Sequence, residues 1–464
     1  MVLKSINPTT EDVVETFEEF SEAQIDAALQ QSFDAQRRWR LTSFGERSAR
    51  LQSAARVLRA QKARLAALAT REMGKPIVEA EAEVEKCAYN CDFYAENAAA
   101  FLADEHVEMN LSNSFVAFEP LGVVLAIMPW NFPFWQVFRF AAPALMAGNG
   151  AVLKHASNVP SCALAIEDVL RAAGLPDGLF RTVLVPGAGV EPLIGDPRIA
   201  AVTLTGSSDV GERVAGTAGK HLKKQVLELG GSDPFIVLAD ADLDAAVRVA
   251  VRARNQNNGQ SCIAAKRFIV EAAAAEQFTE KFAATVRALQ VGDPMQRETN
   301  VGPLAREDLR ETLARQVARS VKAGAHALTG GLSLNGKGYF YAPTVLAGVS
   351  EDMPAFREET FGPVAAVIRA RDPEDAVRLA NDTEYGLGAA LWTGDVERGK
   401  AIARTIEAGC VFINGMVASD PRIPFGGIKR SGYGRELGSY GIKEFVNIQT
   451  IVVGQPVAPD PPAE

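Results

Sequence analysis

The sequence predicts an α/β protein built from two units, each with a parallel sheet. From Gly122 onward, short apolar runs typical of strands alternate with amphipathic runs typical of helices. Continuous apolar strands of this kind indicate parallel sheets that are covered on both faces. The alternation resumes after Gly230-Gly231, and a chain of 464 residues with 47% hydrophobic content is long enough for two or three domains.

Each element is predicted from the spacing of its apolar residues and from the glycine and proline residues that mark its ends. In the helix expected at residues 44–71, apolar residues recur at helical spacing. Pro133 suits the first turn of the helix at 134–147, and Gly174 ends the helix at 158–173. The expected helices cover residues 21–40, 44–71, 77–102, 134–147, 158–173, 208–218, 242–255, 272–289, 304–323 and 373–381. The expected sheet strands cover residues 123–128, 151–154, 182–185, 200–205, 225–229, 235–238, 268–270, 365–368 and 411–414. Residues 110–119 and 445–453 are expected to form exposed strands outside the main sheets, and the proline-rich tail after residue 456 is expected to be flexible.

Composition excludes several classes of protein. The net charge is −9 and the basic residues are dispersed, which argues against a nucleic-acid partner. Residues 1–12 contain no apolar signal core, and the longest apolar run, residues 121–130, is broken by Pro129 and too short to cross a bilayer. Five scattered cysteines fit a reducing cytoplasm. Cys87 and Cys91 lie four residues apart on an expected helix, where a metal or a disulfide is an alternative, but no histidine or second cysteine pair is near and helix packing is favoured.

The loop of residues 257–262 is the strongest candidate for chemistry. Its small and polar residues, Asn-Asn-Gly-Gln-Ser-Cys, join an expected helix to a β-branched run. A thiol there is reachable by a substrate and close to backbone N–H groups. This environment suits a nucleophile, because only the thiolate attacks and an ordinary thiol, with a pKa of ~8.5, is mostly protonated at neutral pH. The alternative is that Cys262 is one more small buried residue, so its assignment depends on the motifs around it.

Seven motifs occur in one order along the chain. They are Pro129-Trp130-Asn131-Phe132-Pro133, Leu153-Lys154, Thr205-Gly206-Ser207, Glu228-Leu229-Gly230-Gly231, Gly259-Gln260-Ser261-Cys262, Glu359-Thr360-Phe361-Gly362-Pro363 and Pro424-Phe425-Gly426-Gly427. In order and spacing, from about residue 5 to 450, the set resembles the NAD(P)-dependent aldehyde dehydrogenases. Within that family, residues 154–160 and the short N-terminus are similar to the succinate-semialdehyde dehydrogenases of bacteria and cyanobacteria.

The resemblance implies three catalytic residues. Cys262 matches the nucleophile that forms a thiohemiacetal and then a thioester. Asn131 matches the side-chain donor to the oxyanion, working with the backbone N–H of Cys262; by itself it is also a plausible turn residue. Glu228 matches the base that activates water for hydrolysis, and its presence favours release of a free acid over transfer to coenzyme A. Glu436 matches a second glutamate that relays protons, although an exposed surface glutamate is an equally ordinary reading.

The resemblance also implies a nicotinamide cofactor site. Gly206, Ser207 and Gly211 follow a strand and open a helix, so backbone N–H groups there can receive a pyrophosphate. Lys154 matches a contact to the adenosine ribose, Glu359 matches the carboxylate on the nicotinamide ribose, and Phe361 and Trp130 are expected beside them. Ser157 stands where NAD-preferring relatives often carry a glutamate, which would repel a 2′-phosphate. We therefore expect NADP to be preferred, with NAD usable.

The expected substrate is succinate semialdehyde. Arg139 matches an arginine that pairs with the distal carboxylate, for which bidentate geometry is a physical reason, and Ser419 resembles a serine on the opposite wall. Some relatives place a second arginine where this chain has Gln256, and a structural ion pair is the alternative for Arg139. Other small aldehydes or semialdehydes, and a non-catalytic protein that reuses the fold, are the alternative functions.

The implied architecture is aldehyde dehydrogenase-like. A Rossmann-type NAD(P)-binding domain is expected at residues 1–106 and 121–230, and an α/β catalytic domain at 231–430. A small β oligomerisation element is expected at 107–120 and 431–455, followed by a flexible tail at 456–464. An exposed strand with a free edge invites pairing between subunits, so a homodimer or homotetramer is expected.

Overall fold

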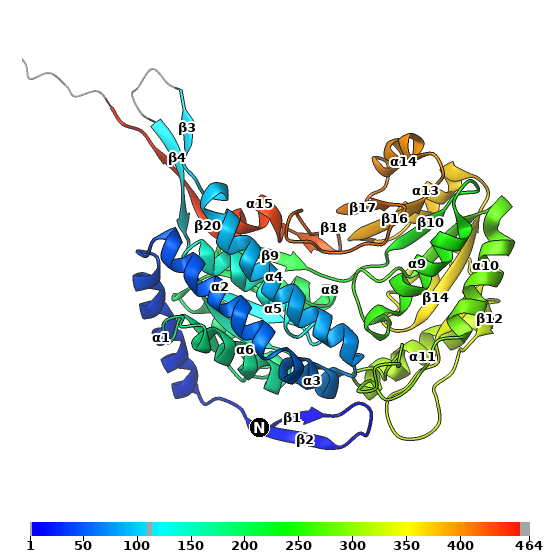
Figure 1. Ribbon diagram of the computed structural model, residues 1–464, viewed down its shortest axis with the longest axis horizontal. Helices are drawn as coiled ribbons and strands as arrows, with labels where there is room; N and C mark the ends of the chain where they lie inside the picture. The colour runs from blue at the N-terminus through cyan, green and yellow to red at the C-terminus, as the bar shows by residue number, and fades with distance from the viewer. Residues whose placement is uncertain (1, 109–113, 455–464) are drawn as a thin grey trace, which may run out of the picture.

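The protein is described here from a computed structural model, which covers residues 2–108 and 114–454. Two lobes, each built on one largely parallel sheet, lie side by side, and a narrow arm projects from the first lobe (Figure 1). The predicted α/β class is therefore confirmed. Over this length of chain no helix is both long enough and apolar enough to span a membrane.

The first sheet has six strands and reverses its order in the middle. Its strands, in spatial order, are β19 (Gly432–Tyr433), β9 (Lys224–Glu228), β8 (Ile199–Thr205), β5 (Val123–Met128), β6 (Gly150–His155) and β7 (Phe180–Thr182). All neighbours are parallel except β19 and β9. The chain moves from β5 to β6 and β7 on one side, then returns to place β8 and β9 on the other. A crevice at the carboxyl ends of β5 and β8 is the expected ligand site of such a sheet.

Helices cover both faces of the first sheet. They are α1 (Glu22–Trp39), α2 (Phe44–Ala60), α3 (Lys62–Met73), α4 (Ile77–Phe101), α5 (Trp135–Met146), α6 (Pro160–Ala172), α7 (Val190–Gly195) and α8 (Ser208–Lys220). Ser21 and Ser43 begin α1 and α2 with reciprocal capping boxes.

The single helix predicted over residues 44–71 is wrong, because the chain breaks at Gln61 into α2 and α3. Gln61 leaves helical geometry, at φ −101° and ψ 9°. The break lets two apolar stripes reach the same core, since Leu58 on α2 and Leu65 on α3 are both fully buried. Gly74, at φ 78°, then ends α3 in the left-handed region that favours glycine.

The strand predicted at residues 182–185 is also misplaced, since β7 ends at Thr182. The run beyond it is buried, but the Leu184 carbonyl accepts from the N–H of Phe20 instead of a sheet neighbour. Val183 still donates its N–H to the Leu153 carbonyl of β6 at 2.9 Å, and the pairing ends there. A buried apolar run that leaves the sheet produces the same sequence signal as a strand.

The second sheet has seven strands: β12 (His326–Thr329), β13 (Thr344–Ala347), β14 (Val364–Ala370), β11 (Arg267–Glu271), β10 (Pro234–Val237), β16 (Gly388–Trp392) and β17 (Cys410–Ile413). Only β12 pairs antiparallel. The helices of this lobe are α9 (Leu243–Asn255), α10 (Ala272–Arg287), α11 (Glu307–Lys322), α12 (Pro354–Arg357), α13 (Pro373–Asn381) and α14 (Val396–Ala403). Strands β12, β13 and β16 were not predicted from the sequence.

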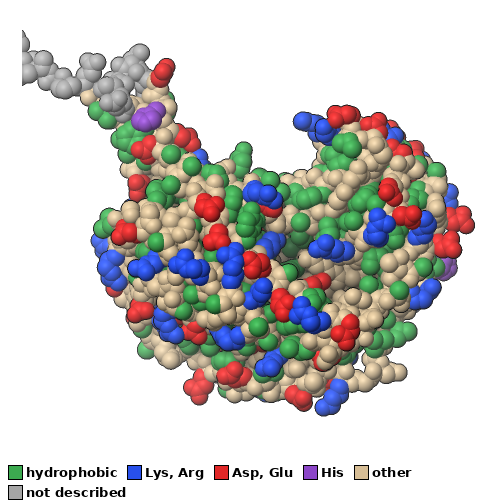
Figure 2. Space-filling model, viewed as in Figure 1, with side chains coloured by type: hydrophobic (Ala, Val, Ile, Leu, Met, Phe, Trp, Pro, Cys, Tyr) green, Lys and Arg blue, Asp and Glu red, His purple; other side chains and the backbone are tan. Residues whose placement is uncertain are grey.

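The arm is a three-stranded sheet, β20 (Val446–Ile451), β4 (Ser114–Pro120) and β3 (Glu105–Val107), which confirms strands at both predicted segments as far as the structure describes them. Residues 110–113 and the tail after residue 456 lie outside the described residues. Apart from these, β1 (Val2–Ile6) pairs with β2 (Val13–Glu18), β15 (Tyr385–Gly386) pairs with β18 (Ile428–Lys429), and α15 (Gly438–Ile442) precedes β20. On the face seen in Figure 2, basic and acidic side chains are intermixed over both lobes.

Candidate active site

The loop before Cys262 has an unusual backbone. Asn257, Asn258 and Gly259 have φ values of 58°, 57° and 71°, so three successive residues lie in the left-handed region. Asparagine tolerates this region better than most residues, and glycine enters it without strain. Gly259 is also sterically required, because a Cβ there would collide with the backbone of Gly362. The turn carries the chain from the end of α9 to the thiol.

The Asn257 side chain ties this loop to the segment that carries Asn131. Its Nδ2 donates to the carbonyl oxygens of Asn131 at 2.8 Å and Gln260 at 2.9 Å. Asn131 Nδ2 itself donates to the Gln260 carbonyl at 3.0 Å. The N–H of Asn257 donates to Glu79 Oε2 at 2.6 Å. Because Asn131, Asn257 and Gln260 are buried from water and Glu79 is half-buried, this network fixes the separation of the thiol loop from the Asn131 amide.

Two buried cations hold the carbonyl groups of the same loop. Lys266 Nζ donates to the carbonyls of Ser261 at 3.1 Å, Cys262 at 2.9 Å and Ala264 at 3.1 Å. Arg254 Nη2 donates to the Gly259 carbonyl at 2.6 Å. Both side chains are fully buried. They orient the peptide planes around Cys262, and Arg254 therefore has a structural role.

A cavity of about 430 Å³ opens at the carboxyl ends of β5 and β8, where the order of the first sheet reverses. Seven of the predicted site residues line it, from both lobes: Trp130, Asn131, Gly206, Ser207, Cys262, Glu359 and Phe361. The rings of Trp130 and Phe361 meet edge to face, 5.7 Å apart. The thiol, the amide and five of the eight proposed cofactor contacts therefore share one cavity. Gly211, Lys154, Ser157, Glu228, Arg139 and Ser419 lie outside its lining.

Burial suppresses ionisation of the candidate nucleophile. It raises the pKa of the Cys262 thiol to about 12, although the positive charges of Arg139 and Lys266 act in the opposite direction. The resting sulfur is therefore a protonated thiol, and a base must remove its proton as the sulfur attacks.

Glu228 lies at the end of β9 and is completely buried. A side chain at Gly426 would meet its Oε1, and neither of its oxygens has a hydrogen-bond partner among the described residues. Burial, reinforced by the nearby Glu436 carboxylate, raises the pKa of Glu228 to about 8. Such a group exchanges a proton close to neutral pH, as a general base must.

Glu436 is buried as well, so it is not the exposed surface residue that was one reading of the sequence. It forms an ion pair with Arg139 Nε. Burial raises the pKa of Glu436, and Arg139 opposes this effect. The two glutamates and Arg139 form one buried charge cluster behind the cavity.

The cofactor contacts expected from the sequence fit a nucleotide. Ser207 precedes α8 without a side-chain cap, so the first N–H groups of that helix are free to receive a phosphate. Glu359 Oε1 accepts a hydrogen bond from the Gly231 N–H at 3.1 Å. The same oxygen lies 3.7 Å from Lys266 Nζ. Its Oε2 lies near Gly230, where a Cβ would crowd it.

At the end of β6, Lys154 is buried and its pKa is lowered by burial alone, without an opposing carboxylate. Ser157, shortly beyond it, is exposed. Gly211 lies inside α8, where a Cβ would meet the side chain of Leu229, so its role there is close packing of the helix on β9. Among residues 2–108 and 114–454 no carboxylate pairs with Lys154, and such a buried ammonium is suited to an anionic group such as a nucleotide phosphate.

The substrate residues expected from the sequence are partly engaged within the protein. Arg139 is 2% exposed; its Nε pairs with Glu436 and its Nη2 donates to Thr205 Oγ1 at 3.2 Å. The bidentate pairing with a substrate carboxylate expected from the sequence is therefore not available in this arrangement. Ser419 is buried and accepts a hydrogen bond from Lys86 Nζ at 2.7 Å.

Sequence reasoning missed the supporting residues Asn257, Lys266, Glu79 and Lys86. The Asn-Asn-Gly run was a usable signal for a left-handed turn. The side-chain partners come from segments far apart in the sequence, which no local pattern reveals.

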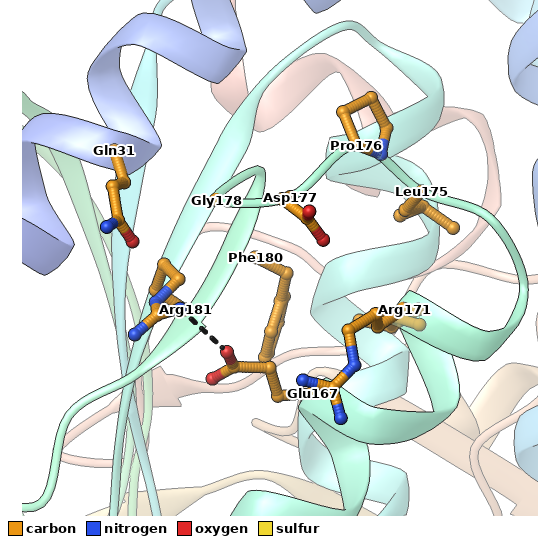
Figure 3. A pocket seen from close by; sticks show the side chains of 10 residues that line it. Gln31, Glu167, Arg171, Leu175, Pro176, Asp177, Gly178, Phe180 and Arg181 are labelled. Carbon is orange, nitrogen blue, oxygen red and sulfur yellow. Dashed lines mark ion pairs between the residues drawn. The ribbon is translucent and has the colours of Figure 1, made fainter.

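A separate hollow of about 510 Å³ lies between α1, α6 and β7 (Figure 3). Its central charges are already paired: Arg181 Nη1 lies 3.2 Å from Glu167 Oε1, and Glu167 Oε2 accepts the Thr182 N–H at 2.6 Å. It contains no thiol, and we do not regard it as the catalytic site.

A half-buried thiol and an amide line one nucleotide-sized cavity at the switch point of a parallel sheet. This is the arrangement of a nucleotide-dependent enzyme that acts through cysteine. Comparison with known proteins agrees. The model of the aldehyde dehydrogenase family matches residues 1–451. The chain belongs to the aldehyde dehydrogenase family.

Individual relatives are similar over nearly their whole length. A probable succinate-semialdehyde dehydrogenase (NADP+) from Synechocystis sp. is 53% identical, over 97% of this chain and 99% of the relative. Succinate-semialdehyde dehydrogenase (NADP+) 1 from Mycobacterium tuberculosis is 51% identical, with the same coverage. The crystal structure of succinic semialdehyde dehydrogenase from Streptococcus pyogenes with NADP+ superposes with a TM-score of 0.95 at 37% identity, covering 98% of this chain and all of that one.

The raised pKa of Glu228 predicts the pH dependence of turnover. A base acts only when ionised, so kcat for aldehyde oxidation should be small below neutrality and rise through about pH 8. Glu228→Gln should lower kcat by about 10²–10⁴-fold. Steady-state kcat over a pH series measures the first effect, and the exposed Glu212→Gln serves as control. A kcat that stays constant across neutrality, or a Glu228→Gln enzyme that turns over normally, contradicts this assignment.

Proposed function

We propose that this protein oxidises succinate semialdehyde to succinate with NADP+, through a thiohemiacetal and a thioester on Cys262. The observation that carries the proposal is the shared cavity, which holds the Cys262 thiol and the Asn131 amide beside an uncapped helix N-terminus. The names of relatives about half identical over their full length support the substrate and the cofactor.

In the first step the Cys262 sulfur attacks the aldehyde carbon, and the thiol proton passes to ionised Glu228 directly or through water. The carbonyl oxygen becomes an oxyanion. Asn131 uses one N–H of its amide to hold Gln260, which leaves the other for the oxyanion. The backbone N–H of Cys262 is the second donor. Removing one such donor typically raises the barrier by about 2.7–4 kcal/mol.

The bound nicotinamide supplies a hydride acceptor. Glu359 is held by Gly231 and Lys266 so that a carboxylate oxygen can receive the ribose hydroxyls, while Trp130 and Phe361 enclose the cavity. Once the adduct has lost its hydride, a thioester remains on Cys262. Glu228 must first pass on the thiol proton that it accepted, and Glu436 is the carboxylate beside it. Ionised Glu228 then removes a proton from water, the hydroxide attacks the thioester carbon, and the C–S bond breaks to release the acid and the Cys262 thiolate. Glu436, which Arg139 holds by an ion pair, offers a route for these protons away from the site.

NADP+ is proposed as the preferred cofactor, with NAD+ also accepted. Lys154 has a buried positive charge without an acidic partner in the part of the chain that the structure describes, and Ser157 is exposed and uncharged. Neither side chain repels a 2′-phosphate, whereas a glutamate at position 157 would.

The arm supports a proposal about assembly. Ile448 on β20 is 61% exposed and Val107 on β3 is 44% exposed, so apolar side chains and a strand edge face solvent on a projecting sheet. Pairing with the arm of another copy would cover both. We propose a homo-oligomer, either a dimer or a tetramer. All five cysteines are free thiols, which agrees with the cytoplasm as the proposed compartment.

A steady-state assay of the purified protein tests the proposed function. We expect kcat/KM to be highest for succinate semialdehyde, lower for glutarate semialdehyde and lowest for butanal, and higher with NADP+ than with NAD+. Cys262→Ser should abolish turnover with every aldehyde, and Cys162→Ser, on a buried thiol outside the site, is the matched control. Preference for an uncharged aldehyde would overturn the proposed substrate, and preference for NAD+ the proposed cofactor.

A further inference from the structure

Lys86 on α4 is a half-buried cation that neither the catalytic nor the cofactor site uses. Its Nζ lies 4.2 Å from the centre of the Trp135 ring and donates to Ser419 Oγ at 2.7 Å. Trp135 begins α5, and Arg139 lies four residues later on the same face of that helix. Lys86, Ser419 and Arg139 therefore meet beside α5, although they come from three distant parts of the chain.

The carboxylates that approach Lys86 are committed to other partners. Glu83 pairs with Lys75 and accepts the N–H groups of Phe134 and Trp135, both at 2.9 Å. Asp420 is held by Arg422 through bonds of 2.8 and 2.7 Å. No carboxylate of residues 2–108 and 114–454 lies within ion-pair distance of Lys86. Burial and the positive charge of Arg139 together lower the pKa of Lys86 to about 8, which shows that its charge is poorly compensated.

Arg139 cannot neutralise a substrate carboxylate alone. Its Nε is taken by Glu436 and its Nη2 by Thr205, so only Nη1 is left without a partner among the described residues. The net charge of the Arg139–Glu436 pair is close to zero. The sequence also lacks the second arginine that some relatives carry, because Gln256 stands there.

We propose that Lys86 is the second cation of the substrate site and binds the distal carboxylate of the semialdehyde together with Ser419 and Arg139. This assignment rests on the proposed function. Arg139 is a charged neighbour of both Cys262 and Lys86. Gln136, which follows Trp135 on α5, lines the cavity that also holds the Cys262 thiol, so this end of α5 lies beside the thiol. The Phe425 ring, 5.0 Å from the Arg139 guanidinium, and the Trp135 ring offer apolar contact to the methylene groups of the substrate. Lys86 therefore determines specificity for an acid aldehyde.

The test compares two aldehydes of similar length, succinate semialdehyde and butanal, in Lys86→Met. Methionine keeps the apolar stem against Trp135 and removes the charge. KM for succinate semialdehyde should rise at least about tenfold, the loss expected when a hydrogen bond to a charged group disappears, with little change in kcat. KM for butanal should change by less than about twofold. Lys86→Arg should restore most of the affinity, and Lys62→Met, on an exposed lysine, is the matched control.

Binding of the product gives a readout independent of turnover. The dissociation constant of succinate should rise about tenfold in Lys86→Met, and that of butyramide, an uncharged analogue, should not change. If Lys86→Met fails to fold, Lys86→Gln is measured in the same way. Equal losses on both aldehydes, or an unchanged KM for succinate semialdehyde, would overturn the assignment. If wild type itself shows no preference for succinate semialdehyde over butanal, the proposed function fails; if wild type shows the preference and Lys86→Met retains it, only the role of Lys86 fails.

Discussion

The active site depends on one buried side chain, the amide of Asn257, which joins the thiol loop to the segment after β5. One lobe supplies Cys262 and the other supplies Asn131, so their relative position is not determined by either sheet alone. Asn257 donates to the carbonyls of Asn131 and Gln260 together, from a backbone in the left-handed region. A conformation that is unfavourable in isolation is thus maintained by hydrogen bonds on several sides.

The electrostatics of the site follow from burial. Enclosure raises the pKa of the Cys262 thiol to about 12 and that of Glu228 to about 8, so both groups keep their protons to higher pH than they would in water. It raises the pKa of Glu436 as well, but the ion pair with Arg139 opposes that shift. The cations beside them have defined tasks. Lys266 binds loop carbonyls, and Arg139 compensates the negative charge of Glu436. The proposed role of Lys86 is to bind the carboxylate of the substrate.

Most of the architecture could be predicted from the sequence, because apolar strands such as residues 123–128 are bounded by turn residues and carry a strong signal. Strand β16, Gly-Ala-Ala-Leu-Trp, could not, since its small residues lack the β-branched pattern and it is a strand only because β10 and β17 pair with it. The cavity residues were predictable because their motifs are local. Two contacts could not be predicted: the ion pair of Arg139 with Glu436 and the hydrogen bond of Lys86 to Ser419. Each joins segments that are distant in the sequence, and the local spacing of residues does not show which distant segments meet.

The central claim is that Asn257 acts on catalysis through the placement of Asn131 and Cys262. A double-mutant cycle on the single-turnover rate of hydride transfer tests it most directly, with Asn257→Ala, Asn131→Ala and the double variant. If Asn257 works by positioning Asn131, the double variant should be about as slow as Asn131→Ala alone, because the same oxyanion donor has been lost in both. Losses of the two single variants that add in full would contradict the claim, since Asn257 would then act independently of Asn131.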